Sequence, residues 1–386
     1  MPASDGRKVV VAAHFGWGIF RYRLELARAL VRAGYEVIAV ADWSDGDYER
    51  QVRAAGIATE SISLTRSRFG PLSDLRTLLQ FVSLYRRLRP GAAFHFNARI
   101  YLLGGLAARI ARVPVIVNGV NGIGIVLGGA MKKYANLYLP LYKAAFGGKV
   151  LAVFQNTSDR ERMIEAGIVP RERTFHVPGS GVDTEALKPD PAVTPEARNL
   201  VVMACRMVWP KGVKEFVEAA ELLKPRFPHI RFILAGGLSG DYGMRAPDDV
   251  PREWLRAAEA RGAVEWAGHV EPAKLEDMFR HSAAVVLPSF YPEGVPRCLI
   301  EGAAAGAPIV TTDTPGCRDI VVDGVSGRLA PPRDSARFAE ALAEVIATPE
   351  TVGRMGAQSR KLAVDVFDAN KISAAYEAIA RTAAKA

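Results

Sequence analysis

Short, mostly apolar runs alternate with amphipathic helical stretches along this chain, and the alternation limits the folds open to it. Four such runs lie in the first half, at residues 7–13, 35–42, 113–120 and 149–156. Residues 22–34, between the first two runs, have the spacing of an amphipathic helix that ends on a glycine. Strands that are apolar at consecutive positions are typical of parallel sheets covered by helices on both faces. The pattern therefore predicts a doubly wound α/β fold.

The same pattern restarts after residues 188–199, a polar stretch that contains three prolines. Further strand-like runs follow at 199–206, 229–237, 263–268, 283–289 and 307–313. A chain of 386 residues exceeds the size at which one hydrophobic core stops growing. We therefore expect two Rossmann-like domains, residues 1–182 and 183–367, that face each other across a cleft. A final helix at about 368–386 is expected to pack back on the first domain.

Cysteine content and hydropathy exclude several classes of protein. The three cysteines are odd in number and lack metal-ligand spacing, which fits a reducing compartment and argues against a disulfide framework or a zinc site. The N-terminus carries only about six apolar residues in a row, too few for a signal peptide. No uninterrupted apolar run reaches the length of a membrane span. The sequence predicts a protein that is soluble or held at a membrane surface.

The positive charge is concentrated in the first half of the chain. Residues 1–180 contain 25 Lys and Arg against 13 Asp and Glu, whereas residues 181–386 contain 25 against 28. Such a half suits an anionic partner, either nucleic acid, a phosphorylated ligand or acidic lipid, although solubility alone explains it equally well. Residues 66–90 and 131–149 mix basic residues with Leu, Phe and Tyr. Each stretch fits an interfacial helix at anionic headgroups or a packed helix with an ordinary basic face.

Two acids stand eight positions apart in FYPEGVPRCLIEG, residues 290–302. Glu293 falls in the loop after a predicted strand, and Glu301 lies more than a turn into the next helix, which Pro296 is suited to begin. The acids are then expected to contact different parts of one extended ligand. The alternative is an acid that complements the helix dipole and a solvated helix face. The apolar neighbours of Glu301 favour the ligand, because an acid in such packing needs partners.

Two cations bracket the turn CRMVWPKG, residues 205–212, at the end of another predicted strand. Arg206 and Lys211 provide the concentrated positive charge that a diphosphate requires. Two solvated bases on a surface loop are the alternative. Ligands of doubly wound sheets bind outside the carboxyl ends of the strands, where this turn and the Glu293 loop are both expected. Their shared edge favours the diphosphate.

The first strand is followed by HFGWGIF, residues 14–20, where Gly16 and Gly18 permit close approach of a phosphate or sugar. A dinucleotide fingerprint requires a third glycine, but position 21 is Arg. Asp42, at the end of the second strand, only partly imitates the ribose-binding acid of that fingerprint. The segment therefore argues against an NAD site.

Taken together, these motifs resemble those of retaining glycosyltransferases of family 4, which have the GT-B fold. The resemblance rests on the E-x7-E pattern of Glu293 and Glu301, on RMVWPKG, and on PGSGVD at 178–183, and it spans essentially the whole chain. Residues 97–124 and 153–183 are similar to the bacterial branch that extends undecaprenyl-diphosphate-linked sugars.

The resemblance implies a nucleotide-sugar donor, most often a UDP-sugar, bound mainly by the second domain without a metal or cofactor. By position, Glu301 would hold the ribose hydroxyls and Glu293 the hydroxyls of the donor sugar. Arg206 and Lys211 would neutralise the diphosphate. The catalytic set implied is Glu293, Arg206 and Lys211.

Further contacts are implied around this set. The backbone at Gly294 and Val295 would aid the phosphate contact, and Gly16 would close over the phosphate from the first domain. Val270, in AGHV at 267–270, would border the base. Where relatives carry a histidine on the acceptor side, VNGVNGIG offers Asn118 and Asn121.

The sequence therefore predicts a retaining, metal-independent hexosyl- or N-acetylhexosaminyltransferase. Its acceptor would be a polyprenyl-diphosphate-linked saccharide in surface polysaccharide or glycan assembly. It would act from the cytoplasm on the inner face of the plasma membrane, with an anionic membrane surface and no nucleic acid as partner. The alternatives are a soluble acceptor, a two-lobed sugar-binding protein without chemistry, and, weakest, a dehydrogenase.

Overall fold

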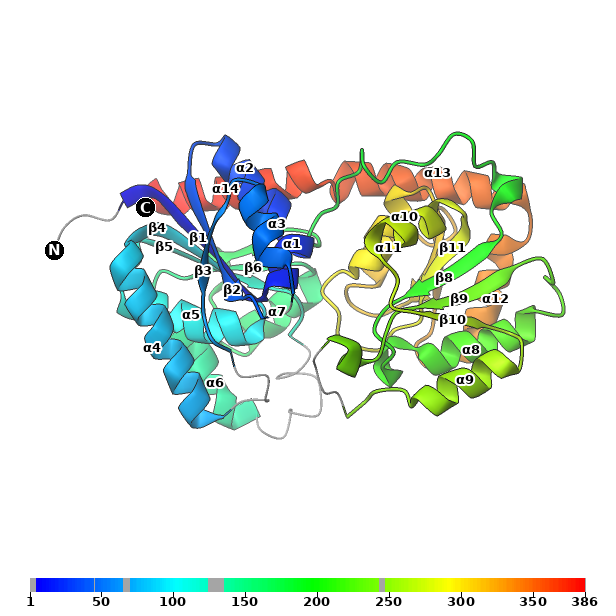
Figure 1. The fold of residues 1–386 in the computed structure, drawn as a ribbon, viewed down its shortest axis with the longest axis horizontal. Helices are drawn as coiled ribbons and strands as arrows, with labels where there is room; N and C mark the ends of the chain where they lie inside the picture. Colours follow the sequence, from blue (N-terminus) through cyan, green and yellow to red (C-terminus); the bar gives the residue numbers. More distant parts are fainter. Residues whose placement is uncertain (1–4, 45, 65–69, 124–134, 243–246, 386) are drawn as a thin grey trace. The chain divides into compact units, whose positions relative to one another are not determined.

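The computed structural model describes residues 5–44, 46–64, 70–123, 135–242 and 247–385. The chain divides into two compact units (Figure 1). Unit 1 comprises residues 1–181 with 369–386, and unit 2 comprises residues 182–368. None of the helices in the described ranges combines the length and hydropathy needed to cross a bilayer.

Unit 1 is built on a seven-stranded parallel sheet with the strand order β3-β2-β1-β4-β5-β6-β7. Its strands are β1 (Asp5–Phe15), β2 (Glu36–Asp42), β3 (Ala58–Ser61), β4 (Pro90–Phe96), β5 (Val115–Val120), β6 (Leu151–Phe154) and β7 (Thr174–His176). The order reverses between β1 and β4. Such a switch point opens a crevice at the carboxyl ends of the strands, where ligands of this architecture bind.

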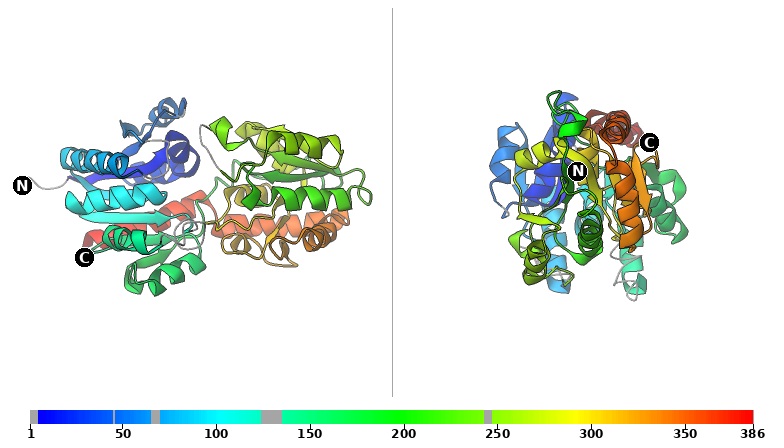
Figure 2. Two further views of the ribbon diagram at one scale, coloured as in Figure 1. Left: turned by 90° about the horizontal axis from the view of Figure 1, so that it is seen from below. Right: turned by 90° about the vertical axis from the view of Figure 1, so that its right-hand side faces the viewer.

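Helices cover both faces of this sheet (Figure 2). They are α1 (Gly16–Tyr22), α2 (Leu24–Arg32), α3 (Tyr48–Ala54), α4 (Pro71–Leu88), α5 (Ala98–Ile110), α6 (Ala135–Ala145), α7 (Thr157–Glu165) and α14 (Ala369–Lys385). Alternate residues of β1 enter different cores, as the period of a strand requires. Val9 and Val11 pack in the cluster that includes α2 and α14, and Val10 and Ala12 pack with α4 and α5. The C-terminal helix α14 contacts α2 and β5.

Unit 2 has a six-stranded parallel sheet with the order β10-β9-β8-β11-β12-β13. Its strands are β8 (Leu200–Ala204), β9 (Arg231–Ala235), β10 (Glu265–Gly268), β11 (Ser282–Leu287), β12 (Ile309–Thr312) and β13 (Gly327–Ala330). Its helices are α8 (Val213–Leu223), α9 (Arg252–Ala260), α10 (Pro272–Arg280), α11 (Arg297–Ala304), α12 (Ser335–Ile346) and α13 (Pro349–Val366). Its order reverses between β8 and β11.

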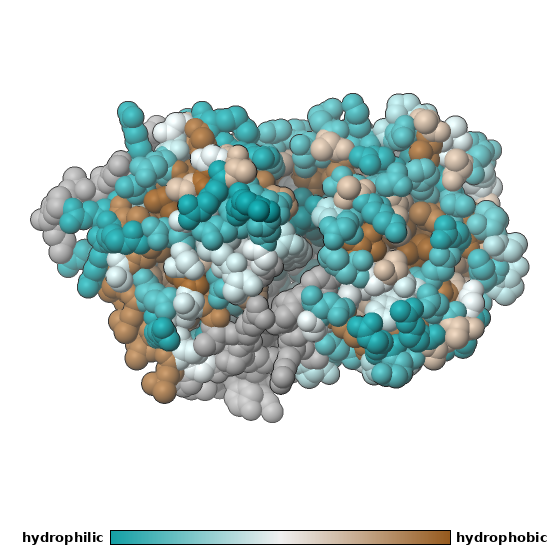
Figure 3. Space-filling model, viewed as in Figure 1, coloured by the Kyte–Doolittle hydropathy of each residue, from teal (hydrophilic) through white to brown (hydrophobic). Residues whose placement is uncertain are grey.

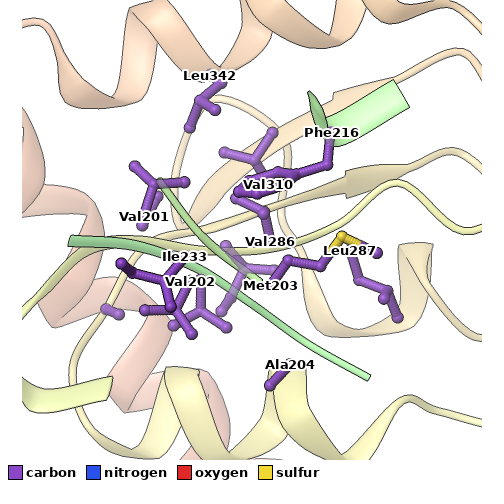
Figure 4. Packing of buried hydrophobic residues seen from close by; sticks show 14 of the residues in the cluster. Val201, Val202, Met203, Ala204, Phe216, Ile233, Val286, Leu287, Val310 and Leu342 are labelled. Carbon is purple, nitrogen blue, oxygen red and sulfur yellow. The ribbon is translucent and has the colours of Figure 1, made fainter. Parts of the chain in front are cut away.

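Short 3₁₀ helices complete the chain: η2 (Arg171–Arg173), η3 (Pro195–Ala197), η4 (Trp209–Lys211), η5 (Ser239–Tyr242) and η6 (Arg318–Ile320). The core of unit 2 is made by consecutive apolar residues of its central strands (Figure 4). Val201 and Val202, for example, are both fully buried although they point to opposite faces of the sheet.

The doubly wound parallel architecture predicted from the sequence is thus present in both units. The strand-like runs coincide with β1, β2, β5, β6 and β8–β12, within a few residues at each end. The two basic, aromatic-rich stretches are described only in part, as α4 and α6. Their residues Arg66, Arg68, Lys132 and Lys133 lie outside the described residues.

Candidate active site

The turn after β8 brings Lys211 against the loop after β11. Lys211 ends η4, and Gly212 caps it with φ at +84°. A Cβ atom at position 212 would lie 2.1 Å from the carbonyl oxygen of Pro288. The backbone N–H groups of Phe290 and Tyr291 also donate to the Pro210 carbonyl, at 3.0 and 3.1 Å. A glycine is required here both by the left-handed backbone and by the close approach.

Lys211 forms an ion pair with Glu293, in which its Nζ contacts Oε1 of the carboxylate. The two side chains are only 17% and 11% exposed. Burial by itself lowers the pKa of Lys211, but the charge of Glu293 and the hydrogen bond to it raise that pKa above the ordinary value. The lysine is therefore held in its charged form, which an anionic ligand needs.

Ser289 supports this pair and was not identified from the sequence. Its fully buried hydroxyl lies 2.9 Å from Oε1 of Glu293 and 3.2 Å from the carbonyl oxygen of Pro210, as a donor in either case. The backbone N–H of Tyr291 donates to the same hydroxyl at 3.1 Å. Ser289 thus contacts both the carboxylate of Glu293, on its own loop after β11, and the turn after β8. Its place as the last residue of the strand-like run 283–289 was visible in the sequence, but its contacts were not.

Glu301 lies on α11, which begins at Arg297 with Pro296 as the N-cap residue, one position later than predicted. Glu301 is 3% exposed, and its Oε1 accepts a hydrogen bond of 2.8 Å from Nε of Arg297. The spacing of four residues places both side chains on one face of the helix. Arg297 therefore provides the partner that an acid among apolar neighbours requires.

The charges of these ion pairs act on two cysteine thiols. Burial raises the pKa of Cys205 to about 12, and Lys211 and Glu293 both act on it electrostatically. Burial also raises the pKa of Cys298, and this thiol is affected by Lys211, Glu293 and Glu301. Cys298 lies in the first turn of α11, one turn from Glu301 and five residues after Glu293.

The backbone between the two acids is packed from the β12 side. Gly316, in the loop after β12, has φ at +84°, and a Cβ on it would lie 1.6 Å from the carbonyl oxygen of Gly294. Val295 is buried. This contact fixes the path of the chain between Glu293 and the start of α11.

Two other predicted residues of unit 2 lie at the same edge. Arg206 is half-buried, and its charge acts on the pKa of Cys205 and of Tyr291, both near Lys211. Val270 follows β10, two strands from β8, and packs against the core. The carboxyl edge from β10 to β11 thus carries the whole predicted set of unit 2. Within the described residues, no three His, Cys, Asp or Glu side chains lie close enough together to hold a metal ion.

In unit 1, the two predicted asparagines have different surroundings. Asn118 is fully buried on β5, where its Oδ1 contacts Nδ1 of His95 at 3.0 Å and its amide donates to two backbone carbonyl oxygens. Asn121 follows the end of β5, and its Oδ1 accepts from Arg23 at 3.0 Å and from Gln155 at 3.3 Å. Asn118 is therefore occupied within the core, and Asn121 stands at the edge of the sheet.

His95 and Gly16 of unit 1 also differ in this way, one lying in the core and the other at the carboxyl edge of the sheet. His95 on β4 is fully buried, and its Nε2 lies 2.7 Å from the hydroxyl of Tyr85. Burial lowers the pKa of His95 to about 4. Gly16 is buried at the first position of α1, directly after β1. It shares the carboxyl edge of the unit 1 sheet with Asn121.

Two family models match the chain, one in each half. Residues 18–179 match "Glycosyl transferase 4-like domain", and residues 186–362 match "Glycosyl transferases group 1". A relative from Campylobacter jejuni is 24% identical over 343 residues, which cover 85% of this chain and 86% of the relative. It is an N,N'-diacetylbacillosaminyl-diphospho-undecaprenol alpha-1,3-N-acetylgalactosaminyltransferase.

Solved structures share the fold. Anabaena Alr3699/HepE, in complex with UDP and glucose, superposes with a TM-score of 0.77 at 18% identity, covering 98% of this chain and 100% of that one. Sucrose-phosphate synthase from Thermosynechococcus elongatus gives a TM-score of 0.75 at 17% identity, covering 97% and 98%. At these identities the likeness concerns the fold alone.

Proposed function

The chain belongs to glycosyltransferase family 4, with the GT-B fold, and from that premise we propose that it transfers a sugar from a UDP-sugar to a polyprenyl-diphosphate-linked saccharide. The observation that carries the proposal is the Lys211–Glu293 ion pair, which stands with Glu301 at the carboxyl edge of unit 2. A sugar diphosphate needs both kinds of group. Cations bind its phosphates, and carboxylates accept hydrogen bonds from its hydroxyls.

The proposed donor lies along the edge from β10 to β11. Glu301 accepts hydrogen bonds from the ribose, Glu293 accepts them from the transferred sugar, and Val270 borders the base. The backbone at Gly294 and Val295 contacts the phosphates. The HepE structure that shares this fold is a complex with UDP and glucose, which supports uridine as the first base to test.

We assign the catalytic work to electrostatics. The bond between the anomeric carbon and the phosphate oxygen breaks while a bond to the acceptor hydroxyl forms on the same face, so the configuration is retained. Negative charge grows on the leaving diphosphate, and Lys211 and Arg206 stabilise it. The departing phosphate oxygen takes the proton of the acceptor hydroxyl, so no protein base is required.

The acceptor is assigned to unit 1. The C. jejuni relative acts on a sugar linked to diphospho-undecaprenol, according to its name, and a lipid-linked acceptor of this class suits a basic unit. Unit 1 contains 28 Lys and Arg against 14 Asp and Glu. Asn121 and Gly16 are the acceptor-side and phosphate-side residues proposed here. Work on a lipid-linked substrate would place the protein on the inner face of the plasma membrane.

A donor screen tests the proposal. UDP-, GDP- and ADP-sugars are incubated with the protein, and release of the free nucleotide is measured for the unmodified chain and for Glu301→Ala. We expect hydrolysis of UDP-sugars that Glu301→Ala abolishes. Turnover of none of the donors, or equal turnover by the variant, would refute the assignment. Transfer to a short water-soluble acceptor at the rate of a lipid-linked one would replace the lipid-linked acceptor with a soluble one.

A further inference from the structure

Helix α4 of unit 1 has two apolar faces, and only one of them is buried. Phe81, Leu84 and Tyr85 lie in the core. On the outer side, Leu72, Leu75 and Leu79 are 85%, 51% and 58% exposed. Their spacing of three and four residues places them in one stripe. Figure 3 shows apolar atoms gathered on the outer surface of unit 1, where Figure 1 places α4.

The described residues that line the surface beside this leucine stripe are uncharged or positive. A shallow surface groove is lined by the three leucines together with Arg76, Gln80 and Ser83. Asp74 is the one acid in α4, and Arg99 neutralises it with hydrogen bonds of 2.9 and 2.5 Å from Nε and Nη2. Exposed leucines beside an exposed arginine are the composition of a helix that lies at an anionic lipid interface.

The stripe lies toward the carboxyl edge of the unit 1 sheet. Asp74 contacts Arg99, which is the second residue of α5 and follows closely on the end of β4. Gln80 accepts a hydrogen bond of 3.0 Å from the backbone N–H of Ser63, which follows the end of β3. The N-terminal half of α4 therefore stands beside the strand ends, the edge that also carries Asn121.

We propose that the leucine stripe of α4 inserts among the headgroups of an anionic bilayer, next to the strand ends that receive the acceptor. The inference rests on the lipid-linked acceptor of the proposed function. A second copy of the chain is a poorer occupant of this face. A symmetric dimer would bring the strongly basic units together, with Arg76 of each copy near the seam, whereas acidic headgroups neutralise these charges.

Vesicle binding tests the proposal. The full chain is sedimented with vesicles of phosphatidylcholine alone or with about one-third phosphatidylglycerol. We expect binding to the anionic vesicles that weakens as salt rises. The double variant Leu75→Glu with Leu79→Glu is expected to bind at least tenfold more weakly, because each change adds an opposing charge and removes apolar area.

Leu222→Glu is the matched control. Leu222 is 55% exposed on α8 of unit 2, so the same change is made at a comparable position outside the stripe. It should leave vesicle binding unchanged. Equal binding by all variants, or a changed oligomeric mass of the double variant without a change in vesicle binding, would overturn the proposal. Donor hydrolysis by the double variant should equal that of the unmodified chain, which separates this inference from the proposed function.

The acids of unit 2 support a second inference, because each is held by a side chain outside the predicted set. Ser289 lies 2.9 Å from Oε1 of Glu293, and Nε of Arg297 lies 2.8 Å from Oε1 of Glu301. Both contacts are largely shielded from water. We infer that Ser289 and Arg297 are positioning residues, the first for the sugar end of the donor and the second for its ribose. This also rests on the proposed function.

The two roles predict opposite patterns of loss. Arg297→Ala should weaken UDP binding about tenfold, the scale of one charge-assisted hydrogen bond, and should remove the preference for UDP over 2′-deoxy-UDP. Ser289→Ala should leave UDP binding unchanged and lower the turnover of the UDP-sugar about tenfold. Arg297→Lys should restore part of the ribose preference. Titration calorimetry with both nucleotides and hydrolysis rates give the measurements.

A merely structural role for these residues would have a different signature. If each variant weakens nucleotide binding and turnover to the same extent, or if neither changes them, the positioning roles are wrong. Binding of UDP by the unmodified chain is measured in the same series, so a failure of the donor assignment is seen separately from a failure of the variants.

Discussion

The two units have the same kind of sheet but use the polar side chains on and after its strands differently. In unit 1, Asn118 is tied to His95, and Arg99 is tied to Asp74. In unit 2, Lys211 and Glu293 stand on two loops and keep part of their surface exposed. A doubly wound sheet fixes where a ligand can bind, but the loop residues decide which unit offers charge to a compact ligand.

The two units also differ in net charge. Unit 1 holds 28 basic against 14 acidic residues, and unit 2 holds 22 against 27. Unit 1 also carries the leucine stripe of α4. A broad basic surface suits an extended anionic partner, whereas a paired lysine suits a single diphosphate.

Substitution of Lys211 tests most directly whether unit 2 binds the diphosphate. We expect Lys211→Ala to lower turnover of the donor about 10²–10³-fold, the scale on which one electrostatic contact to a developing anion contributes. Lys214→Ala is the control, because Lys214 is exposed on α8 and pairs with Glu218. Steady-state hydrolysis of the UDP-sugar gives both values. Equal losses of turnover in the two variants would mean that Lys211 has no specific contact with the donor and that only the total charge of unit 2 matters.

Gly212, in the same turn after β8, is expected to matter for the stability of the protein. Gly212→Ala should destabilise the protein by about 3 kcal/mol, because it adds a left-handed backbone cost and a clash with the Pro288 carbonyl. Gly262 is the control, since its φ is +82° and a Cβ there has nothing within 4 Å. Gly262→Ala should cost about 1 kcal/mol from the backbone alone. Denaturant unfolding measures both, and equal costs would contradict the close approach.

The sequence predicted the doubly wound architecture and nine of the 13 strands in the described residues, but not β3, β4, β7 and β13. It also indicated the four charged side chains proposed for unit 2, but not the groups that hold them. The apolar runs are long and unbroken enough to reveal parallel strands, and spacing alone put Glu293 in a loop and Glu301 in a helix. Ser289 and Arg297 were not found, because their roles depend on distances of 2.9 and 2.8 Å that only folding creates. Nor does spacing reveal that α4 leaves one leucine face uncovered.

The two asparagines of unit 1 are expected to affect different properties of the protein, one its stability and the other its transfer activity. Asn118→Ala should destabilise the protein by about 2–3 kcal/mol, because it leaves buried partners of its amide unsatisfied. Asn121→Ala should change stability little and lower transfer to the acceptor about tenfold, while donor hydrolysis stays unchanged. Unfolding and product assays on both variants give the result. Loss of transfer in Asn118→Ala at temperatures where it is folded would reverse the assignment of the two residues.

The smallest effect concerns the buried histidine of unit 1. Burial lowers the pKa of His95 from 6.5 to about 4, so the folded protein binds fewer protons at this site than the unfolded chain. The stability that depends on the neutral form of this histidine is therefore complete above pH 6.5 and is lost as the pH falls toward 4. The loss relative to neutral pH is about 2 kcal/mol at pH 5. His95→Gln should reduce the stability difference between pH 7.5 and pH 5 by that amount. His229→Gln, at an exposed position of unit 2, is the control. If both variants keep the full pH dependence, the acid sensitivity does not come from the core of unit 1.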